Sequence, residues 1–233
     1  YALLAHRVAA RRAAMVVAVS ETTAEDLRRR WAVPAERIVV ARHGPGQEPE
    51  TRRPRTANPR HFLSVGDDEP RKNLELLLAG YARYRVAARG AGAAPLPLVL
   101  AGSAAAAGLE GVETIDRPDA EHLAELYAQA AALVHPSLHE GFGLTPLEAM
   151  SAGTPVLAAC RAGVCEVGGD AAVYVEPTDA PALADQLAAL ALDPALRRDR
   201  TERGRRRAAE FSWRRSALAH LDAYALAIGG ART

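Results

Sequence analysis

The chain has 233 residues, with 29 Lys and Arg against 28 Asp and Glu, which gives a net charge of +1. This balance argues against a dedicated nucleic-acid-binding protein. Apolar residues make up 49% of the chain and aromatic residues only 5%, so Ala, Leu and Val must fill a core of ordinary size.

Several global features bear on location. Cys160 and Cys165 are too few for a disulfide framework, and we interpret them as reduced thiols of a cytoplasmic protein. No apolar run is long enough to span a membrane, and arginines interrupt the first apolar stretch, unlike a signal peptide. Residues 1–60 carry 12 Arg and 6 acidic residues, which permits peripheral association with the inner face of a membrane without requiring it. The first residue is Tyr1 rather than Met, which indicates a fragment of a longer protein.

Short apolar runs alternate with helical patterns along the chain. The runs predict strands at Met15–Val19, Ile38–Ala41, Phe62–Val65, Leu96–Ala101, Val112–Ile115, Ala132–His135, Pro155–Ala159 and Ala172–Val175. The patterns predict helices at Ala24–Trp31, Leu74–Arg85, Ala120–Ala130, Pro146–Ala152, Pro181–Leu192 and Trp213–Ala227. Because near-continuous apolar strands alternate with helices, we predict an α/β fold with a doubly wound, Rossmann-like parallel sheet.

One segment interrupts this alternation. Residues 44–57 are rich in Pro, Gly, Arg and Glu and show no periodicity, which predicts a linker between domains. Residues 1–43 are then expected to be the tail of a preceding domain, and residues 58–211 a complete doubly wound domain. Residues 212–233 are expected to form a helix that docks back toward the preceding domain.

The chain contains one lysine among its 29 basic residues, Lys72. It follows the predicted strand Phe62–Val65, in a loop that begins at Gly66, and the ends of strands in open α/β sheets are where ligands bind. An ammonium group is a compact charge that can reach a phosphate oxygen, whereas Arg prefers planar bidentate partners. The position therefore predicts a phosphate-binding lysine, the alternative being an ordinary surface lysine.

The run from Glu140 to Glu148 is the most informative stretch. Its glycines, at 141 and 143, let the backbone approach a ligand. Thr145 is predicted to cap a helix with Pro146 at its first position, and Glu148 completes a capping box. Free N–H groups at such a helix start can bind an anion, so the run predicts a site for phosphate and neighbouring hydroxyls. The alternative is that Glu148 is only a cap and Glu140 only a solvated loop residue.

In this order the motifs resemble the retaining glycosyltransferases of the GT-B fold, in particular the large family 4, with a mannosyltransferase-like pattern. The resemblance covers about residues 16–215 and rests on Val17–Glu21, Ile38–Gly44, Gly66–Asn73, Glu140–Val156 and Glu166–Ala171. It implies that the chain is the C-terminal, donor-binding domain of a GT-B fold with a remnant of the N-terminal domain. The missing N-terminal domain would bind the acceptor and complete the active site.

The resemblance also implies roles for individual residues. Lys72, helped by Arg71 and next to the turn at Gly66, would hold the donor diphosphate. Glu140 would contact sugar hydroxyls near the reacting carbon, which makes Glu140, Lys72 and Arg71 the expected catalytic residues. The amides of Phe142 and Gly143, after the flexible Gly141, would meet the donor sugar, and those of Leu144 and Thr145 the phosphates. Glu148 would bind the ribose diol, and the backbone around Ile115–Pro118, with Ile115 and Arg117, would line the base pocket.

The implied reaction moves a sugar from a nucleoside-diphosphate sugar to an unknown glycan, lipid or small-molecule acceptor, with retention of configuration. GDP-mannose is the first expected donor and a UDP- or dTDP-sugar the second. No metal and no other cofactor is implied, and Asp67 and Asp68 are adjacent rather than in an Asp-x-Asp motif.

One departure from the family pattern keeps an alternative open. Asp67 stands where many members have a phosphate-binding Arg. Asp67 and the missing N-terminal domain together favour a non-catalytic nucleotide-sugar-binding module that works with another chain. A nucleotide-sugar epimerase is disfavoured by the spacing of the two glutamates. A phosphorylase is disfavoured because the single lysine already lies in the phosphate loop.

Overall fold

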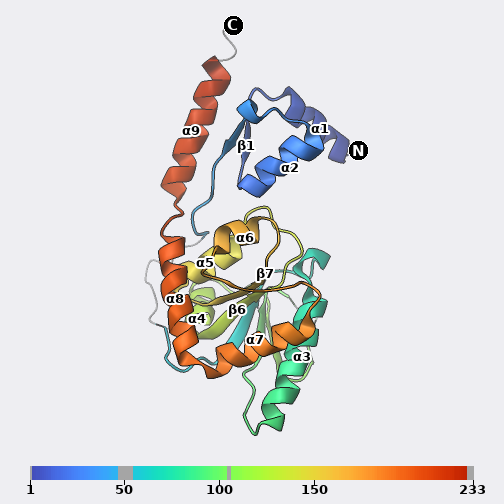
Figure 1. The fold of residues 1–233 in the computed structure, drawn as a ribbon, viewed down its shortest axis with the longest axis vertical. Helices are drawn as coiled ribbons and strands as arrows, with labels where there is room; N and C mark the ends of the chain where they lie inside the picture. The colour runs from blue at the N-terminus through green and yellow to red at the C-terminus, as the bar shows by residue number, and fades with distance from the viewer. Residues whose placement is uncertain (1, 47–54, 104–105, 230–233) are drawn as a thin grey trace.

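The computed structural model describes residues 2–46, 55–103 and 106–229. Within them lie a two-stranded sheet, β1-β2, and a six-stranded sheet of order β5-β4-β3-β6-β7-β8. Figure 1 shows the small sheet and its helices at one end of the molecule, and the large sheet and its helices at the other. The predicted doubly wound parallel sheet is confirmed.

The large sheet reverses its strand order in the middle. Every neighbouring pair in it is parallel. From β3 the chain moves outward through β4 and β5, then returns to β6 on the other side of β3 and continues through β7 to β8. In such sheets ligands bind where the order reverses, at the carboxyl ends of the two central strands, here β3 and β6. The strands are β3 His61–Val65, β4 Leu98–Ala101, β5 Val112–Ile115, β6 Ala130–His135, β7 Val156–Ala159 and β8 Val173–Val175.

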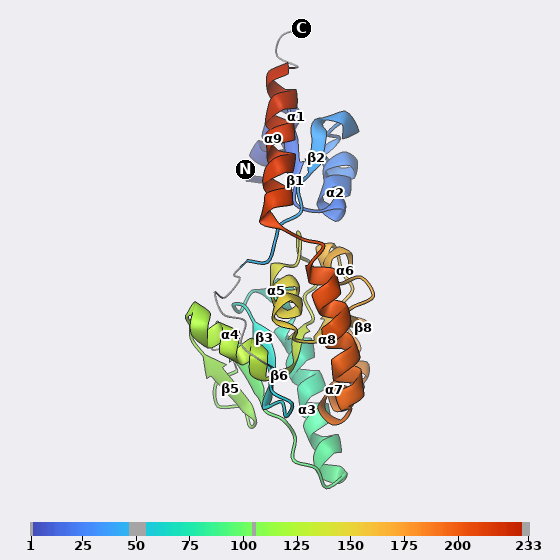
Figure 2. The same ribbon diagram turned by 90° about the vertical axis from the view of Figure 1, so that its left-hand side faces the viewer.

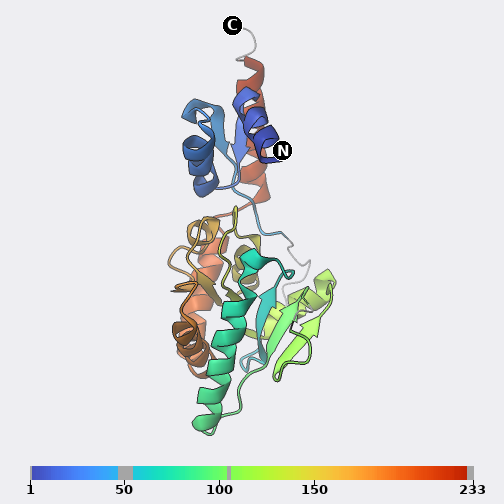
Figure 3. The same ribbon diagram turned by 90° about the vertical axis from the view of Figure 1, so that its right-hand side faces the viewer.

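Helices cover both faces of this sheet because successive strand residues point to opposite sides. Phe62 faces the layer of α3 (Leu74–Gly90) and α7 (Ala180–Leu192), whereas its neighbour Leu63 faces the second layer. Figure 3 shows α3 along the first face. The second layer contains α4 Ala120–Gln129, α5 Leu144–Ala152, α6 Gly163–Gly168 and α8 Pro194–Ala208.

The helices α6, α8 and α1 (Ala2–Arg12) were not predicted. Helix α8 consists mainly of charged residues, and in its 15 residues only Arg197, Gly204 and Ala208 are buried. Apolar periodicity therefore cannot reveal it. A start signal was present, however, because Asp193 caps the helix and Pro194 occupies its first position.

The small sheet belongs to a second unit with its own core. Strands β1 (Val16–Ala18) and β2 (Ile38–Val40) are parallel, and α2 (Glu21–Trp31) and the 3₁₀ turn Ala35–Arg37 connect them. Ala18, Ala24, Leu27 and Val33 form the core of this unit. The C-terminal helix α9 (Trp213–Gly229) leaves the end of α8 and lies alongside β1 and β2, as Figure 2 shows.

Helix α9 buries only part of its surface against this unit. Ser216 and Ala223 are buried, whereas its larger apolar side chains are 47–64% exposed: Trp213, Leu218, Leu221, Tyr224, Leu226 and Ile228. Among the described residues no helix is both long enough and apolar enough to cross a bilayer.

The interpretation of Cys160 and Cys165 as reduced thiols is wrong for this structure, which joins them in a disulfide. Cys160 follows the end of β7 and Cys165 lies in α6, and the tight turn between the two elements brings their Cα atoms within 4.9 Å. This separation is within the range that a disulfide requires. The number of cysteines indicated the absence of a framework but carried no information about this local turn.

Candidate functional site

The loop after β3 is attached to the loop after β6. Residues Pro70–Lys72 form a 3₁₀ turn, and Asn73 then begins α3 in a left-handed conformation. The Asn73 side-chain amide donates hydrogen bonds to the carbonyls of Pro136 and Pro177. In return the Leu138 N–H donates to the Arg71 carbonyl over 2.7 Å. These bonds place Arg71 and Lys72 directly beside the segment that leads to Glu140.

Three of the predicted site residues meet here. Lys72 Nζ and Arg71 Nη1 each lie 2.8 Å from Glu140 Oε1. The Lys72 and Glu140 side chains are only 17% and 15% exposed, so water screens their attraction less than at an open surface. Gly66 is a fourth member. Its φ is +142°, and a Cβ there would lie 3.1 Å from Lys72 Cε, so the close approach of the lysine requires glycine.

His135, at the end of β6, joins this cluster without having been predicted. Its Nε2 lies 3.4 Å from Glu140 Oε1, and the residue is 3% exposed. Burial lowers the pKa of His135, so its ring is neutral near pH 7. The sequence did contain a signal for its role, because His135 is the one polar residue at the end of an apolar run.

Glu140 is held as an anion. Burial alone would raise the pKa of Glu140, but the contacts with His135 and Lys72 outweigh it and hold this pKa well below its usual value. Both cations of the loop therefore pair with the same carboxylate, and Arg71 pairs with Glu69 as well. A phosphate that binds Lys72 would compete with Glu140 for an ammonium that has three N–H donors.

A cavity opens at this point, at the carboxyl ends of β3, β4 and β6. Lys72, His135, Ser137, Gly66 and Asp67 are among the residues that line it. The Ser137 hydroxyl and His135 Nε2 are buried. Among the described residues the hydroxyl has no hydrogen-bond partner, and Nε2 has only the 3.4 Å contact with Glu140. Because buried polar groups are normally satisfied, the Ser137 hydroxyl gives the cavity unused hydrogen-bonding capacity.

The predicted helix start is wrong by two residues. Helix α5 begins at Leu144, and the cap is Gly143, with φ of +104° and no side-chain hydrogen bond. The left-handed turn that glycine permits replaces the Thr145 cap, so Thr145 lies inside the first turn. The N–H groups of Leu144 and Thr145 are still among those that no helical carbonyl can satisfy. Phe142 is only 5% exposed and packs against His43 and Phe211.

Glu148 has no capping role. Its Oε2 accepts a hydrogen bond from the Tyr127 hydroxyl over 3.4 Å, and burial raises the pKa of Glu148. The chain at Gly46 passes close to this carboxylate: a Cβ there would lie 2.1 Å from Glu148 Oε1. The interpretation of Glu148 as a cap and nothing more is therefore wrong, whereas its contact with a ribose stays a prediction.

Ile115 and Arg117 lie apart from the cluster. Ile115 ends β5, two strands away from β3, and packs partly buried against the second helix layer. The Arg117 side chain is 91% exposed. Within the described parts of the chain, no hydrogen bond or ion pair joins either residue to Lys72 or Glu140. Their assignment to a base pocket stays a prediction.

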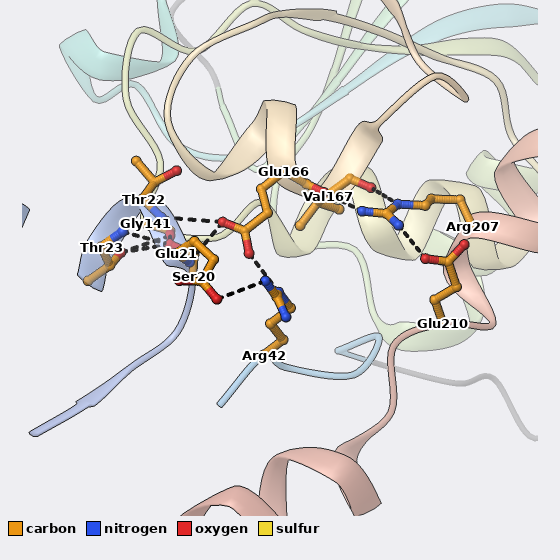
Figure 4. Close-up of polar contacts among 10 residues, drawn as sticks. All are labelled: Ser20, Glu21, Thr22, Thr23, Arg42, Gly141, Glu166, Val167, Arg207 and Glu210. Atoms are coloured by element: carbon orange, nitrogen blue, oxygen red, sulfur yellow. Dashed lines mark hydrogen bonds and ion pairs between the residues drawn. The ribbon is translucent and has the colours of Figure 1, made fainter. Parts of the chain in front are cut away.

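The small unit contacts the turn after Glu140, and the sequence did not predict these contacts. Figure 4 shows them: the Ser20 and Thr23 hydroxyls lie 2.6 and 3.1 Å from the Gly141 carbonyl oxygen. Nearby, Glu166 of α6 accepts hydrogen bonds from the first N–H groups of α2 and forms an ion pair with Arg42.

Comparisons with known proteins agree with this geometry. Residues 47–207 match the family described as Glycosyl transferases group 1. An O-antigen chain mannosyltransferase B of Escherichia coli is 30% identical over 92% of this chain and 61% of its own length. An MMP alpha-(1->4)-mannosyltransferase of Mycolicibacterium hassiacum is 40% identical over 46% of this chain and 27% of its own length.

Among solved structures, a sucrose-phosphate synthase of Thermosynechococcus elongatus superimposes with a TM-score of 0.78 and 26% identity. The match covers 98% of this chain and 62% of that one. The chain thus spans less than two thirds of the length of the mannosyltransferase B and of the sucrose-phosphate synthase. These likenesses confirm the predicted GT-B glycosyltransferase fold.

Proposed function

Because this chain belongs to the group 1 glycosyltransferases, we propose that it binds a nucleoside-diphosphate sugar between β3 and β6 and supplies the donor site for sugar transfer. The observation that carries the proposal is the convergence of Lys72 and Glu140 over 2.8 Å from the two strands that flank the reversal of strand order. A cation and a carboxylate at this position suit a diphosphate joined to a sugar.

The chemistry of transfer fits these groups. Departure of a nucleoside diphosphate places negative charge on the phosphates and positive character on the sugar carbon. Lys72, Arg71 and the N–H groups of Leu144 and Thr145 would stabilise the phosphate charge. Glu140, held as an anion, would favour the developing positive charge on the sugar. We propose retention of configuration, with the acceptor entering from the face that the phosphate leaves, and a mechanism that needs no metal.

We propose GDP-mannose as the donor, with a UDP- or dTDP-sugar as the second candidate. The names of the Escherichia coli and Mycolicibacterium relatives, both mannosyltransferases, support the mannosyl group. The acceptor is a glycan, a lipid or a small molecule. Location on the cytoplasmic side of a membrane stays a prediction, and the pairing of Cys160 with Cys165 does not support it.

Calorimetry with GDP, UDP and dTDP on the same preparation tests the proposal. We expect GDP to bind at least about tenfold more tightly than the other two, a difference of about 1.4 kcal/mol. A chelator in the buffer should leave the affinity unchanged. If none of the three nucleotides binds, the site between β3 and β6 is not a donor site.

A non-catalytic nucleotide-sugar-binding module remains the second candidate, and Asp67 favours it. This carboxylate lines the cavity beside Lys72 and reduces the positive charge available to a diphosphate. The two candidates differ in turnover. A transferase releases nucleoside diphosphate from its donor in the presence of acceptor, whereas a binding module returns the nucleotide sugar unchanged.

Replacement of Glu148 by Gln should change binding and stability in opposite directions. If Glu148 accepts hydrogen bonds from the ribose diol, the variant should bind GDP more weakly but bind 2′,3′-dideoxy-GDP as the original chain does. Calorimetry with the two nucleotides measures this difference. Equal losses for both would contradict the ribose contact.

The stability effect follows from the raised pKa of Glu148. A carboxyl whose pKa is higher in the folded chain favours folding below its unfolded pKa of 4.5, and this contribution is lost as pH rises through the folded value. At pH 7 the buried charge therefore opposes folding. The Glu148→Gln variant should unfold at a higher temperature than the original chain at pH 7, and this gain should shrink toward pH 4.

A further inference from the structure

We propose that Ser20 and Thr23 are positioning residues for the donor sugar: from the small unit, they hold the Gly141 carbonyl and thereby fix the turn that follows Glu140. The inference rests on the proposed function, because the turn matters only if a donor binds there. Neither hydroxyl was assigned a role from the sequence.

The contact is specific in geometry. Ser20 Oγ lies 2.6 Å and Thr23 Oγ1 3.1 Å from the same carbonyl oxygen, which has two lone pairs to offer. Ser20 is the N-cap residue of α2, and it is completely buried. Its oxygen also accepts a hydrogen bond from the Thr23 N–H, so the helix cap and the contact with the turn share one hydroxyl.

The other side of the turn is held by α6. The Gly163 N–H donates to the Glu140 carbonyl over 3.1 Å. A Cβ at Gly163 would lie 2.6 Å from both Cα and the carbonyl oxygen of Phe142, so the two backbones are in direct contact. The turn Glu140–Phe142 is thus enclosed between α6 and the first turn of α2. Loss of the α2 contacts would leave the Gly141 carbonyl without the two hydroxyls that hold it.

A separate set of charges keeps α2 in place. Glu166 Oε2 accepts from the Glu21 N–H over 2.9 Å and from the Thr22 N–H over 3.3 Å, at the positive end of the α2 dipole. Glu166 Oε1 pairs with Arg42 over 2.6 Å. The backbone carbonyl of Glu166 in turn accepts from Arg207 of α8, as Figure 4 shows. Glu166 therefore connects the two units beside the turn.

These contacts have a functional consequence. The amides expected to meet the donor sugar belong to the turn that Ser20 and Thr23 hold. Lys72 and Arg71 contact that turn through Glu140, but their loop is also anchored outside it, through Asn73. Removing a hydroxyl from the small unit should therefore weaken recognition of the sugar and leave recognition of the diphosphate largely intact.

Two substitutions of Thr23 separate the hydroxyl from the methyl group. Thr23→Val keeps the shape and removes the hydroxyl, and Thr23→Ser keeps the hydroxyl. We expect Thr23→Val to bind GDP-mannose roughly two- to tenfold more weakly, the range for one lost hydrogen bond, with a smaller change for GDP. Thr23→Ser should bind both as the original chain does. The inference is overturned if Thr23→Val binds GDP-mannose as tightly as the original chain. It is also overturned if Thr23→Ser loses as much GDP-mannose affinity as Thr23→Val.

Hydrogen exchange keeps the two proposals distinguishable. With no nucleotide present, Thr23→Val should exchange the amide hydrogens of residues 140–143 faster than the original chain, with no change in β4 or β7. If the original chain binds no nucleotide sugar, the proposed function fails. Unchanged exchange at 140–143 would then still reject the positioning role by itself.

A matched pair of glutamates tests the connection between the units. Glu166→Gln removes a charge from the interface, whereas Glu25→Gln removes one from the same helix α2, where Glu25 pairs only with Arg28 and Arg29 among the described contacts. We expect Glu166→Gln to reproduce the weaker GDP-mannose binding and the faster exchange at 140–143, and Glu25→Gln to do neither. Equal effects of the two changes would contradict the inference.

Discussion

Replacement of Glu140 by Gln should lower the rate of sugar transfer by a factor of roughly 100 or more, a loss on the scale seen when one preorganised group that stabilises transition-state charge is removed. The amide has the shape of the carboxylate but no charge to set against the positive character of the sugar carbon. Nucleoside diphosphate binding should be preserved or become tighter, because Lys72 and Arg71 are no longer neutralised by Glu140. The measurements are release of GDP from GDP-mannose with acceptor present and calorimetry with GDP.

Glu69→Gln is the matched control. Glu69 also pairs with Arg71, but its side chain is 48% exposed, and its described contact with Lys72 is between backbone groups, which the substitution leaves in place. It should change transfer by less than about threefold, the effect of a surface ion pair. Transfer that survives in Glu140→Gln, or that falls equally in both variants, would remove Glu140 from the proposed mechanism.

The Glu140→Gln variant should also show how much the Glu140 charge stabilises the folded chain. A carboxyl whose pKa is depressed on folding stabilises the chain above its unfolded pKa of 4.5, and this contribution is lost as pH falls through the lower folded value. Glu140→Gln should therefore unfold at a lower temperature than the original chain at pH 7, and the two should converge under strongly acidic conditions. The direction is opposite to that expected for Glu148→Gln.

The sheet could be predicted from the sequence because its signal is local. Buried strands such as β3 and β6 are nearly continuous apolar runs, and burial on both faces favours that composition. Helix α8 lacked the corresponding signal because it buries little. The start of α5 was misplaced since Thr-Pro and Gly both favour a helix start there, and only the left-handed backbone at Gly143 decides between them.

The site residues also fall into those that the sequence predicted and those that it did not. Lys72 and Glu140 were predicted to share a site because each follows an apolar strand and because their motifs resemble the donor site of retaining glycosyltransferases. The structure adds that the two strands, β3 and β6, are neighbours in the sheet. Ser20, Thr23 and Glu166 were not predicted as a group, because their meeting depends on how the small unit sits on the large one. No local pattern encodes that arrangement. His135 is an intermediate case. The sequence shows that it ends an apolar strand, but it does not show that its Nε2 lies 3.4 Å from Glu140 Oε1.

Replacement of Lys72 by Met should weaken binding of nucleoside diphosphate by about 1.5–3 kcal/mol, the range for a hydrogen bond to a charged group. Met retains an unbranched chain that can lie against Gly66, so the loss reports the ammonium rather than the packing. Calorimetry with GDP measures it, and the affinity of the variant should depend less on salt concentration. Arg203→Met, which removes a charge from α8, should leave GDP binding unchanged.

Lys72→Arg gives a sharper version of this test. The chain uses arginine at its other 28 basic positions, and the lysine stem fits against Gly66 with 3.1 Å between Cε and a would-be Cβ. A guanidinium is wider and favours planar partners, so Lys72→Arg should recover less than about half of the lost binding free energy. Full recovery would show that any cation suffices and that the single lysine is incidental.

A double-mutant cycle with Lys72→Met and Glu140→Gln measures how strongly the two side chains are coupled in GDP binding. The ammonium is paired with the carboxylate over 2.8 Å, so a diphosphate would compete for it. Glu140→Gln should therefore tighten GDP binding when Lys72 is present and have a smaller effect when Lys72 is Met. The difference is the coupling free energy of the pair, expected at about 0.5–3 kcal/mol for groups in contact. A coupling near zero would mean that the diphosphate never displaces Glu140 from Lys72, and the proposed exchange of partners would be wrong.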